Sequence, residues 1–171
     1  MSSSLSELQD TASERGEHYF MEVSGNCLHS TLLALRDALR EVDGVDYADP
    51  LLIKATNGMA AGLGAGTGPC GIVSAGSMAL SLKYGTPSLE DWEKRRNAWL
   101  KSRDWYFWFK EQFLSCDCID LSFGTDFADL EQRKKHSEGP RIHVCNTYPT
   151  QAIRKLVDML TVDNPDVIRD S

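Results

Sequence analysis

The chain has 171 residues, of which 42% are hydrophobic and 25% are charged, as in an ordinary globular protein of one domain. Its formal net charge is -7 and its basic residues are spread among acidic ones, so nucleic acid is not expected as a partner. The N-terminus lacks the features of a secretory signal, and no stretch approaches the roughly 20 apolar residues of a membrane span. We therefore expect a cytoplasmic protein with no membrane partner.

The first third of the chain predicts three helices. Apolar residues recur at helical spacing over residues 5–23, and a second helix is expected over residues 27–40. Ser24 or Asn26, in the break between them, can cap that second helix. An Asp-Pro pair is typical of a helix start and predicts a third helix over residues 50–59.

The centre of the chain predicts a turn and two further helices. A glycine-rich turn over residues 58–69 leads into a helix over residues 72–84, whose small side chains allow close approach and predict burial. A capping segment at residues 88–91 then starts the longest helical pattern, which ends near Leu114. Its aromatic residues are expected in the core or at a subunit interface; they are Trp92, Trp99, Trp105, Trp108, Phe109 and Phe113.

The last third of the chain predicts one polar segment and one amphipathic helix. Residues 124–140 are polar and charged, and we expect them to face solvent, including the basic run 132–136. The final amphipathic helix is expected from Thr150 onward, and residues 163–171 form a polar tail.

These elements predict the fold class. No confident strand pattern, internal repeat or linker appears in the sequence. We predict one all-α domain over residues 1–171, with its core at about residues 16–160. It should be a helical bundle in which a glycine-rich turn leads into a buried central helix.

Five cysteines carry the most informative chemistry. They form four stations along the chain: Cys27, Cys70, the pair Cys116 and Cys118, and Cys145. Thiolates are the ligands of iron–sulfur clusters and soft metal ions, and they are also the nucleophiles of thiol redox chemistry. One residue between the paired cysteines is too few for a zinc knuckle. Any shared site must therefore be assembled by the tertiary fold.

The predicted positions of the thiols bear on their reactivity. Cys70, Cys118 and Cys145 fall at predicted helix termini, and Cys27 lies in the first turn of its predicted helix. Helix amides are expected to favour the thiolate at Cys27 and at Cys70. Asp117 and Asp120 flank the thiol pair and are expected to raise nearby thiol pKa values. A shared metal or cluster site, a reactive thiol or disulfide pair, and inert burial all remain open on this pattern.

The order of the cysteines resembles a known family. Gly25-Asn26-Cys27, the segments 70–76 and 78–85, and then Cys118 and Cys145 are similar to the redox-active C_GCAxxG_C_C proteins. The resemblance covers most of the chain, from about Gly16 to Leu160.

Two features depart from the family pattern. Ile72 stands at the place of a motif alanine, and Ser74-Ala75-Gly76 surrounds the place of a motif glycine. Cys116 is additional.

The resemblance implies a helical domain with an iron–sulfur cluster, because a related domain occurs in split-Soret cytochromes, which are dimeric. Carried over to this chain, the cluster, [2Fe–2S] or [4Fe–4S], would be held by Cys27, Cys70, Cys118 and Cys145, with Cys116 as a possible replacement for Cys118. The expected activity is electron transfer to a redox partner protein, and the expected assembly is a homodimer. No haem attachment motif is present.

Two other functions compete with the cluster. A thiol–disulfide enzyme or sensor would use Cys116 with Cys118, or Cys70 with a spatial neighbour. A non-catalytic docking module would keep its cysteines for structure alone. His29 and His143, each two residues from a cysteine, are expected to lie near a site or at the surface rather than to bind metal.

Overall fold

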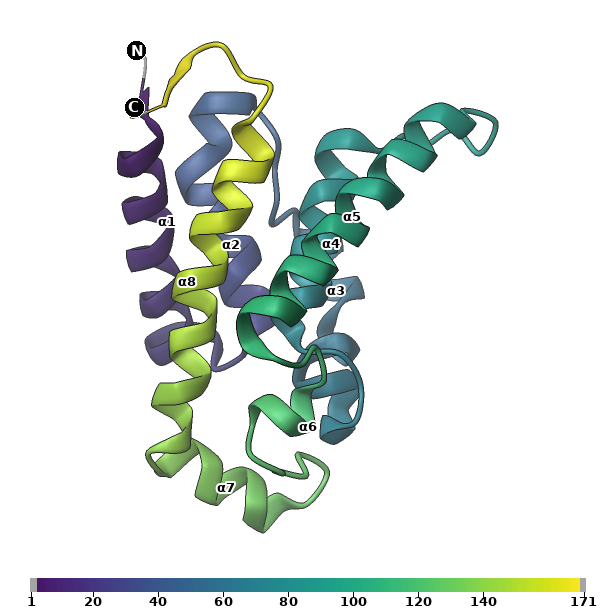
Figure 1. The fold of residues 1–171 in the computed structure, drawn as a ribbon. Coiled ribbons are helices and arrows are strands. Elements are labelled where there is room, and N and C mark those ends of the chain that lie inside the picture. The colour runs from purple at the N-terminus through teal and green to yellow at the C-terminus, as the bar shows by residue number, and fades with distance from the viewer. Residues whose placement is uncertain (1–2, 170–171) are drawn as a thin grey trace.

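The computed structural model describes residues 3–169, and nearly all regular structure in this range is helical (Figure 1). The α-helices are α1 (Leu5–His18), α2 (Cys27–Asp43), α3 (Pro50–Ala55), α4 (Gly71–Tyr84), α5 (Trp92–Phe113), α6 (Cys118–Leu121), α7 (Leu130–Glu138) and α8 (Arg141–Thr161). A π-helical turn, η1 (Tyr19–Ser24), follows α1, and a 3-10 turn, η2 (Asn57–Met59), and a glycine-rich π-type turn, η3 (Gly62–Gly66), precede α4. The predicted all-α, single-domain fold is confirmed.

Side-chain caps start several of these helices. Ser4 and Glu7 form a capping box on α1, and Asn26 caps α2 by accepting a hydrogen bond of 2.9 Å from the backbone N–H of His29. Asp49 caps α3, as the Asp-Pro pair predicts. The longest helix begins later than expected, because Asp91 caps it instead of the serine of the preceding segment.

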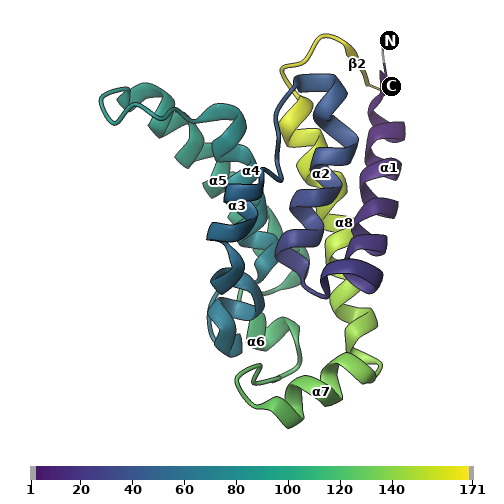
Figure 2. The ribbon, with the colours of Figure 1, turned by 180° about the vertical axis from the view of Figure 1, so that it is seen from behind.

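Helices α1, α2 and α8 form the main bundle, and the pair α4 and α5 projects from it. Helix α1 packs against α2 and α8, while α4 lies between α2 and α5 (Figures 1 and 2). Their facing sides bury the apolar stripes that helical periodicity predicts. The buried side chains of the bundle include Leu8, Ala12, Leu35, Leu39, Ile72, Leu80, Ile153, Leu156 and Leu160.

The aromatic residues of α5 divide into buried and exposed sets. Trp105 and Phe109 are fully buried, and Trp108 and Phe113 pack partly buried against them. Trp92 and Trp99 are 52% and 57% exposed, and they contact each other edge to face near the projecting end of the helix. The predicted core role is therefore confirmed for the second half of α5 only.

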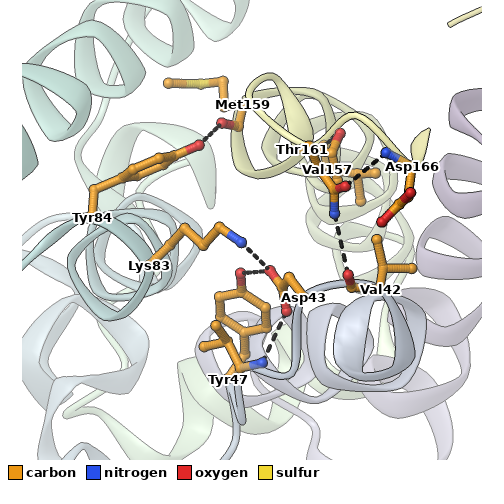
Figure 3. Close-up of polar contacts among 11 residues, drawn as sticks. Val42, Asp43, Tyr47, Lys83, Tyr84, Val157, Met159, Thr161 and Asp166 are labelled. Atoms are coloured by element: carbon orange, nitrogen blue, oxygen red, sulfur yellow. Dashed lines mark hydrogen bonds and ion pairs between the residues drawn. The ribbon is translucent and has the colours of Figure 1, made fainter. Parts of the chain in front are cut away.

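The C-terminal ends of α2, α4 and α8 meet through polar contacts (Figure 3). The buried carboxylate of Asp43 accepts a hydrogen bond from Tyr47 and pairs with Lys83 at 3.1 Å. The hydroxyl of Tyr84 donates to the carbonyl of Met159 at 2.8 Å. Because these three helices run in one direction, their N-terminal parts lie together at the opposite end of the bundle (Figure 1).

The last segments of the chain differ from expectation in two ways. Helix α8 begins at Arg141, well before the predicted start, and contains Pro149, which is buried. Residues beyond 163 are not only a polar tail, because Val167 is buried and β2 (Val167–Ile168) pairs in parallel with β1 (Ser3–Ser4). None of the helices within residues 3–169 is long and apolar enough to cross a bilayer.

Candidate thiol site

Four of the five cysteines line one cavity of about 460 Å³. Cys27 is the first residue of α2, Cys70 precedes α4, Cys118 begins α6, and Cys145 lies in the second turn of α8. The cavity thus collects thiols that are separated by up to 118 positions in sequence, the span from residue 27 to residue 145. All five thiols are free.

A short backbone bridge holds Cys70 and Cys118 side by side. The N–H of Cys70 donates to the carbonyl of Cys116 at 2.7 Å, and the N–H of Cys118 donates to the carbonyl of Gly68 at 2.9 Å. Gly62 has a φ of +61°, and a Cβ there would lie 2.7 Å from the Cβ of Cys118. The glycine-rich turn therefore both bends the chain and makes room for this cysteine.

Cys27 lies directly against the start of α4. A Cβ on Gly71 would come within 2.7 Å of the Cys27 sulfur and 2.9 Å of the backbone nitrogen of Leu28. Glycine at this position allows the N-terminal turns of α2 and α4 to touch. The contact brings the Cys27 and Cys70 thiols together across the two helices.

This contact shifts the pKa values of the two neighbouring thiols in opposite directions. The neighbouring Cys70 thiol, together with the backbone N–H groups of Gly71 and Ile72, lowers the pKa of Cys27 despite its burial. The same pairing and burial raise the pKa of Cys70 well above its usual range. The backbone N–H of Ile72 does favour the Cys70 anion, as expected, but burial and the pairing with Cys27 outweigh it. The first amides of α4 favour the anion of Cys27 as well.

Burial makes the other two cavity thiols weak acids. It raises the pKa of Cys118 to about 12, with a further contribution from the charge of Cys27. It also raises the pKa of Cys145 to about 12, with contributions from Cys27 and Cys118. The aspartates beside the thiol pair are not the main cause, although the charge of Asp117 does raise the pKa of Cys116 after burial.

Cys145 is not at a helix terminus, contrary to the prediction. It lies inside α8, and Pro149 four residues later has no N–H to donate to its carbonyl. Because proline disfavours the interior of a helix, the sequence predicts that the last helix begins only after Pro149. Here Asn146, Pro149 and Ala152 are all buried, so packing holds the helix together through the proline.

Cys116 is turned away from the cavity. Its thiol contacts the carbonyl of Tyr106 in α5 at 3.6 Å, and it does not line the cavity. The alternation of side chains along an extended segment points Cys116 and Cys118 to opposite sides. The structure therefore places Cys118 with the other three thiols.

Residues that the sequence did not single out form the rest of the wall. Phe20, Tyr148 and Ile142 supply apolar surface, and Arg133 and His136 come from one face of α7. Arg133 and His136 belong to the basic run that was expected to face solvent; Arg133 does, but His136 is only 3% exposed. The three-residue spacing of Arg133 and His136 predicts that they share one face of a helix. It does not predict whether the rest of the protein covers that face.

The histidines near cysteines have structural partners. His29 is buried, and its ring nitrogens contact Asn26 at 3.2 Å and Thr56 at 3.2 Å. His143 is exposed. Within residues 3–169 there is no group of three or more His, Cys, Asp or Glu side chains spaced to hold a single metal ion.

The hydrogen bonds of His136 define its neutral form. The hydroxyl of Thr125 donates its one proton to the carbonyl of Ser122 at 2.8 Å. The 3.2 Å contact between Thr125 Oγ1 and His136 Nδ1 must then be donated by the histidine. Neutral His136 therefore carries its proton on Nδ1 and leaves Nε2 as an acceptor.

Buried histidines predict a loss of stability in mild acid. Burial lowers the pKa of His136 and of His29 below the usual 6.5, so the unfolded chain binds protons that the folded chain excludes. The unfolding free energy should therefore be highest above about pH 6.5 and fall as the pH drops through the lower folded pKa values. Urea denaturation at pH 7.5, 6.5 and 5.5 measures this, above the range where most carboxylates titrate.

Two variants assign this pH dependence. His136→Asn can still donate to Thr125 but does not titrate, so its stability should depend less on pH than that of the wild type. His143→Asn changes an exposed histidine and should keep the wild-type dependence. Equal pH dependence in the wild type and His136→Asn would contradict the prediction.

The order of the cysteines agrees with a comparison to known families. Residues 25–159 match the profile of a family described as "Putative redox-active protein (C_GCAxxG_C_C)". The chain belongs to the C_GCAxxG_C_C family. This confirms the resemblance and supports a redox role. No curated protein and no solved structure matches the chain.

The family motif also explains one departure of this chain. Aligned on Cys70, the C_GCAxxG_C_C pattern has alanine directly after the cysteine, where this chain has Gly71. Ile72 then stands at a variable position, and Pro69, Gly71 and Ser74 are the residues that depart from the pattern. The missing Cβ of Gly71 is what allows the close approach of Cys27.

Proposed function

We propose that this C_GCAxxG_C_C protein holds an iron–sulfur cluster through Cys27, Cys70, Cys118 and Cys145 and transfers single electrons. The observation that carries the proposal is the cavity, which gathers one thiol from each of four elements and excludes the fifth thiol. Core-filling cysteines would have no reason to converge in this way.

The donor set fits a cluster chemically. Four cysteine thiolates are the usual ligands of both [2Fe–2S] and [4Fe–4S] clusters, which supply one-electron redox chemistry when bound. A cluster attaches its cysteines to different iron atoms, so it accepts thiols that are spaced more widely than a single tetrahedral ion requires. No Asp or Glu of the described residues lines the cavity to compete as a hard ligand.

The surrounding residues would prepare the thiols for binding. The first amides of α4 favour the anion of Cys27, which makes it the thiol that deprotonates most readily. Cys118 and Cys145 have pKa values raised to about 12, so cluster binding must release their protons and should tighten as the pH rises. Binding would also tie α2, α4, α6 and α8 together.

Iron and acid-labile sulfide in anaerobically purified or reconstituted protein test this proposal. We expect both elements in stoichiometric amounts per chain, with visible sulfur-to-iron charge-transfer absorption that bleaches on reduction. Colourless protein without iron or sulfide after reconstitution would rule out the cluster.

A second function is favoured by the contact between Cys27 and Cys70. These thiols are neighbours in the cavity, and one has a lowered and the other a raised pKa, as in a dithiol whose more acidic member attacks. Oxidation would break two S–H bonds, form one S–S bond, and pass two electrons and two protons to an external disulfide, which becomes a dithiol. The pair Cys116 and Cys118 is less suited, because their sulfurs face different sides.

Thiol counting separates this second function from the first. Metal-free protein equilibrated with oxidised and reduced dithiothreitol should reversibly lose two titratable thiols if Cys27 and Cys70 form a redox pair. Cys70→Ser should abolish the change and Cys116→Ser should not. A constant count of five in the wild type would exclude it. The homodimer and the redox partner protein stay predictions.

A further inference from the structure

The thiol cavity has a second wall that the redox proposal does not use. At about 460 Å³ the cavity has space beyond its four thiols, and Arg133, His136 and Ser137 of α7 line it. These residues are three and four positions apart, so they share one face of the helix. Figure 1 shows α7 crossing below the N-terminal end of α8.

In the part of the chain that the structure describes, the wall of this cavity carries no carboxylate, although the chain as a whole is acidic. The chain has a formal net charge of -7, yet the only formally charged side chain among the described residues of the cavity wall is Arg133. Its neighbours in the helix are paired, since Lys134 meets Glu138 at 4.0 Å and Lys135 meets Glu131 at 2.7 Å. Arg133 makes no ion pair within residues 3–169. Its guanidinium is therefore free to bind an anion.

His136 lines this cavity as well as a smaller neighbouring one beside Thr125 and Arg141, and its ring has an unused hydrogen-bond acceptor. Its Nδ1–H donates to Thr125, and Nε2 has no hydrogen-bond partner among the described residues. Burial and the charge of Arg141 lower the pKa of His136, which keeps the ring neutral and Nε2 unprotonated. A ligand that contacts both residues must place negative charge at the guanidinium of Arg133 and donate a hydrogen bond to Nε2 of His136.

We propose that this cavity binds a small oxyanion that retains a proton, such as hydrogen phosphate, with Arg133 on its charge and His136 Nε2 accepting its O–H. This inference goes beyond the redox role and does not depend on it, because neither residue is a proposed cluster ligand. It assigns a ligand class to the space beside the thiols.

Phosphate and sulfate distinguish this site from a generic positive patch. Both are tetrahedral anions of similar size, but at pH 7 phosphate carries a P–O–H group and sulfate carries no proton. Isothermal titration of the full chain with each anion, at constant ionic strength in chloride, should show phosphate binding at least about 10-fold more tightly, a difference of one good hydrogen bond. Phosphate is redox-inert, so the result is independent of any cluster or disulfide.

Three variants locate the site. Arg133→Gln should weaken phosphate binding about 10-fold or more, and Lys134→Gln, with the same change of charge one residue away and outside the cavity, should leave it within about twofold. His136→Asn keeps a donor for Thr125 but removes Nε2, so it should remove the preference for phosphate over sulfate. Absence of phosphate binding, equal binding of both anions by the wild type, or equal losses in Arg133→Gln and Lys134→Gln would each overturn the proposal.

Discussion

Cys118→Ser is expected to leave the reconstituted protein without iron and labile sulfide, while Cys116→Ser retains both. The two cysteines are separated by one residue, but only Cys118 lines the cavity with the other three thiols. The thiol of Cys116 faces the carbonyl of Tyr106 instead. A serine hydroxyl is a much poorer ligand for iron than a thiolate, so losing one of four ligands should prevent stable assembly. Iron and sulfide assays with visible absorption measure the outcome.

The two serine variants control for each other. Both remove one buried sulfur from the same short segment, so a general loss of folding would affect them alike. Helical circular dichroism of the apo proteins checks this, and it should be equal in both. Cluster loss in Cys116→Ser with retention in Cys118→Ser would show that the wrong member of the pair has been assigned as the ligand.

Gly76→Ala is expected to destabilise the fold by about 1–3 kcal/mol, although alanine is the better helix former. A Cβ on this residue of α4 would lie 2.3 Å from Nε1 of Trp105 and 2.9 Å from Cδ2 of Leu156. Trp105 is fully buried and donates to the carbonyl of Val73 at 3.0 Å, so it cannot simply turn away. Urea denaturation followed by circular dichroism at the helical band measures the free energy of unfolding.

Two comparisons make this result specific. Gly58→Ala places a Cβ where nothing lies within 4 Å, and it should change the unfolding free energy by less than about 0.5 kcal/mol. Trp105→Phe removes the ring atoms nearest Gly76, so the double variant should lose less stability than the sum of the two single variants. Full additivity, or a neutral Gly76→Ala, would contradict the close packing of α4 on α5.

Much of the local structure follows from residues close together in sequence. Helical periodicity and the caps at Asn26 and Asp49 predicted α2 and the start of α3, because a helix turn is stabilised by contacts three and four residues apart. The same reasoning misplaced the start of α8. Pro149 disfavours a helix locally, but burial of that stretch against the bundle outweighs the lost hydrogen bond.

The sequence alone determined that this is an all-α chain and that Cys27, Cys70, Cys118 and Cys145 follow a family order, and it predicted that the chemistry lies in the thiols. Only the tertiary structure decided which thiols meet, because their convergence depends on contacts between helices distant in sequence. It turned Cys116 away from the cavity, placed the first amides of α4 beside Cys27 as well as Cys70, and brought Arg133 and His136 to the same cavity. Local spacing specifies the face of one helix, whereas a neighbour's position depends on how several helices pack together.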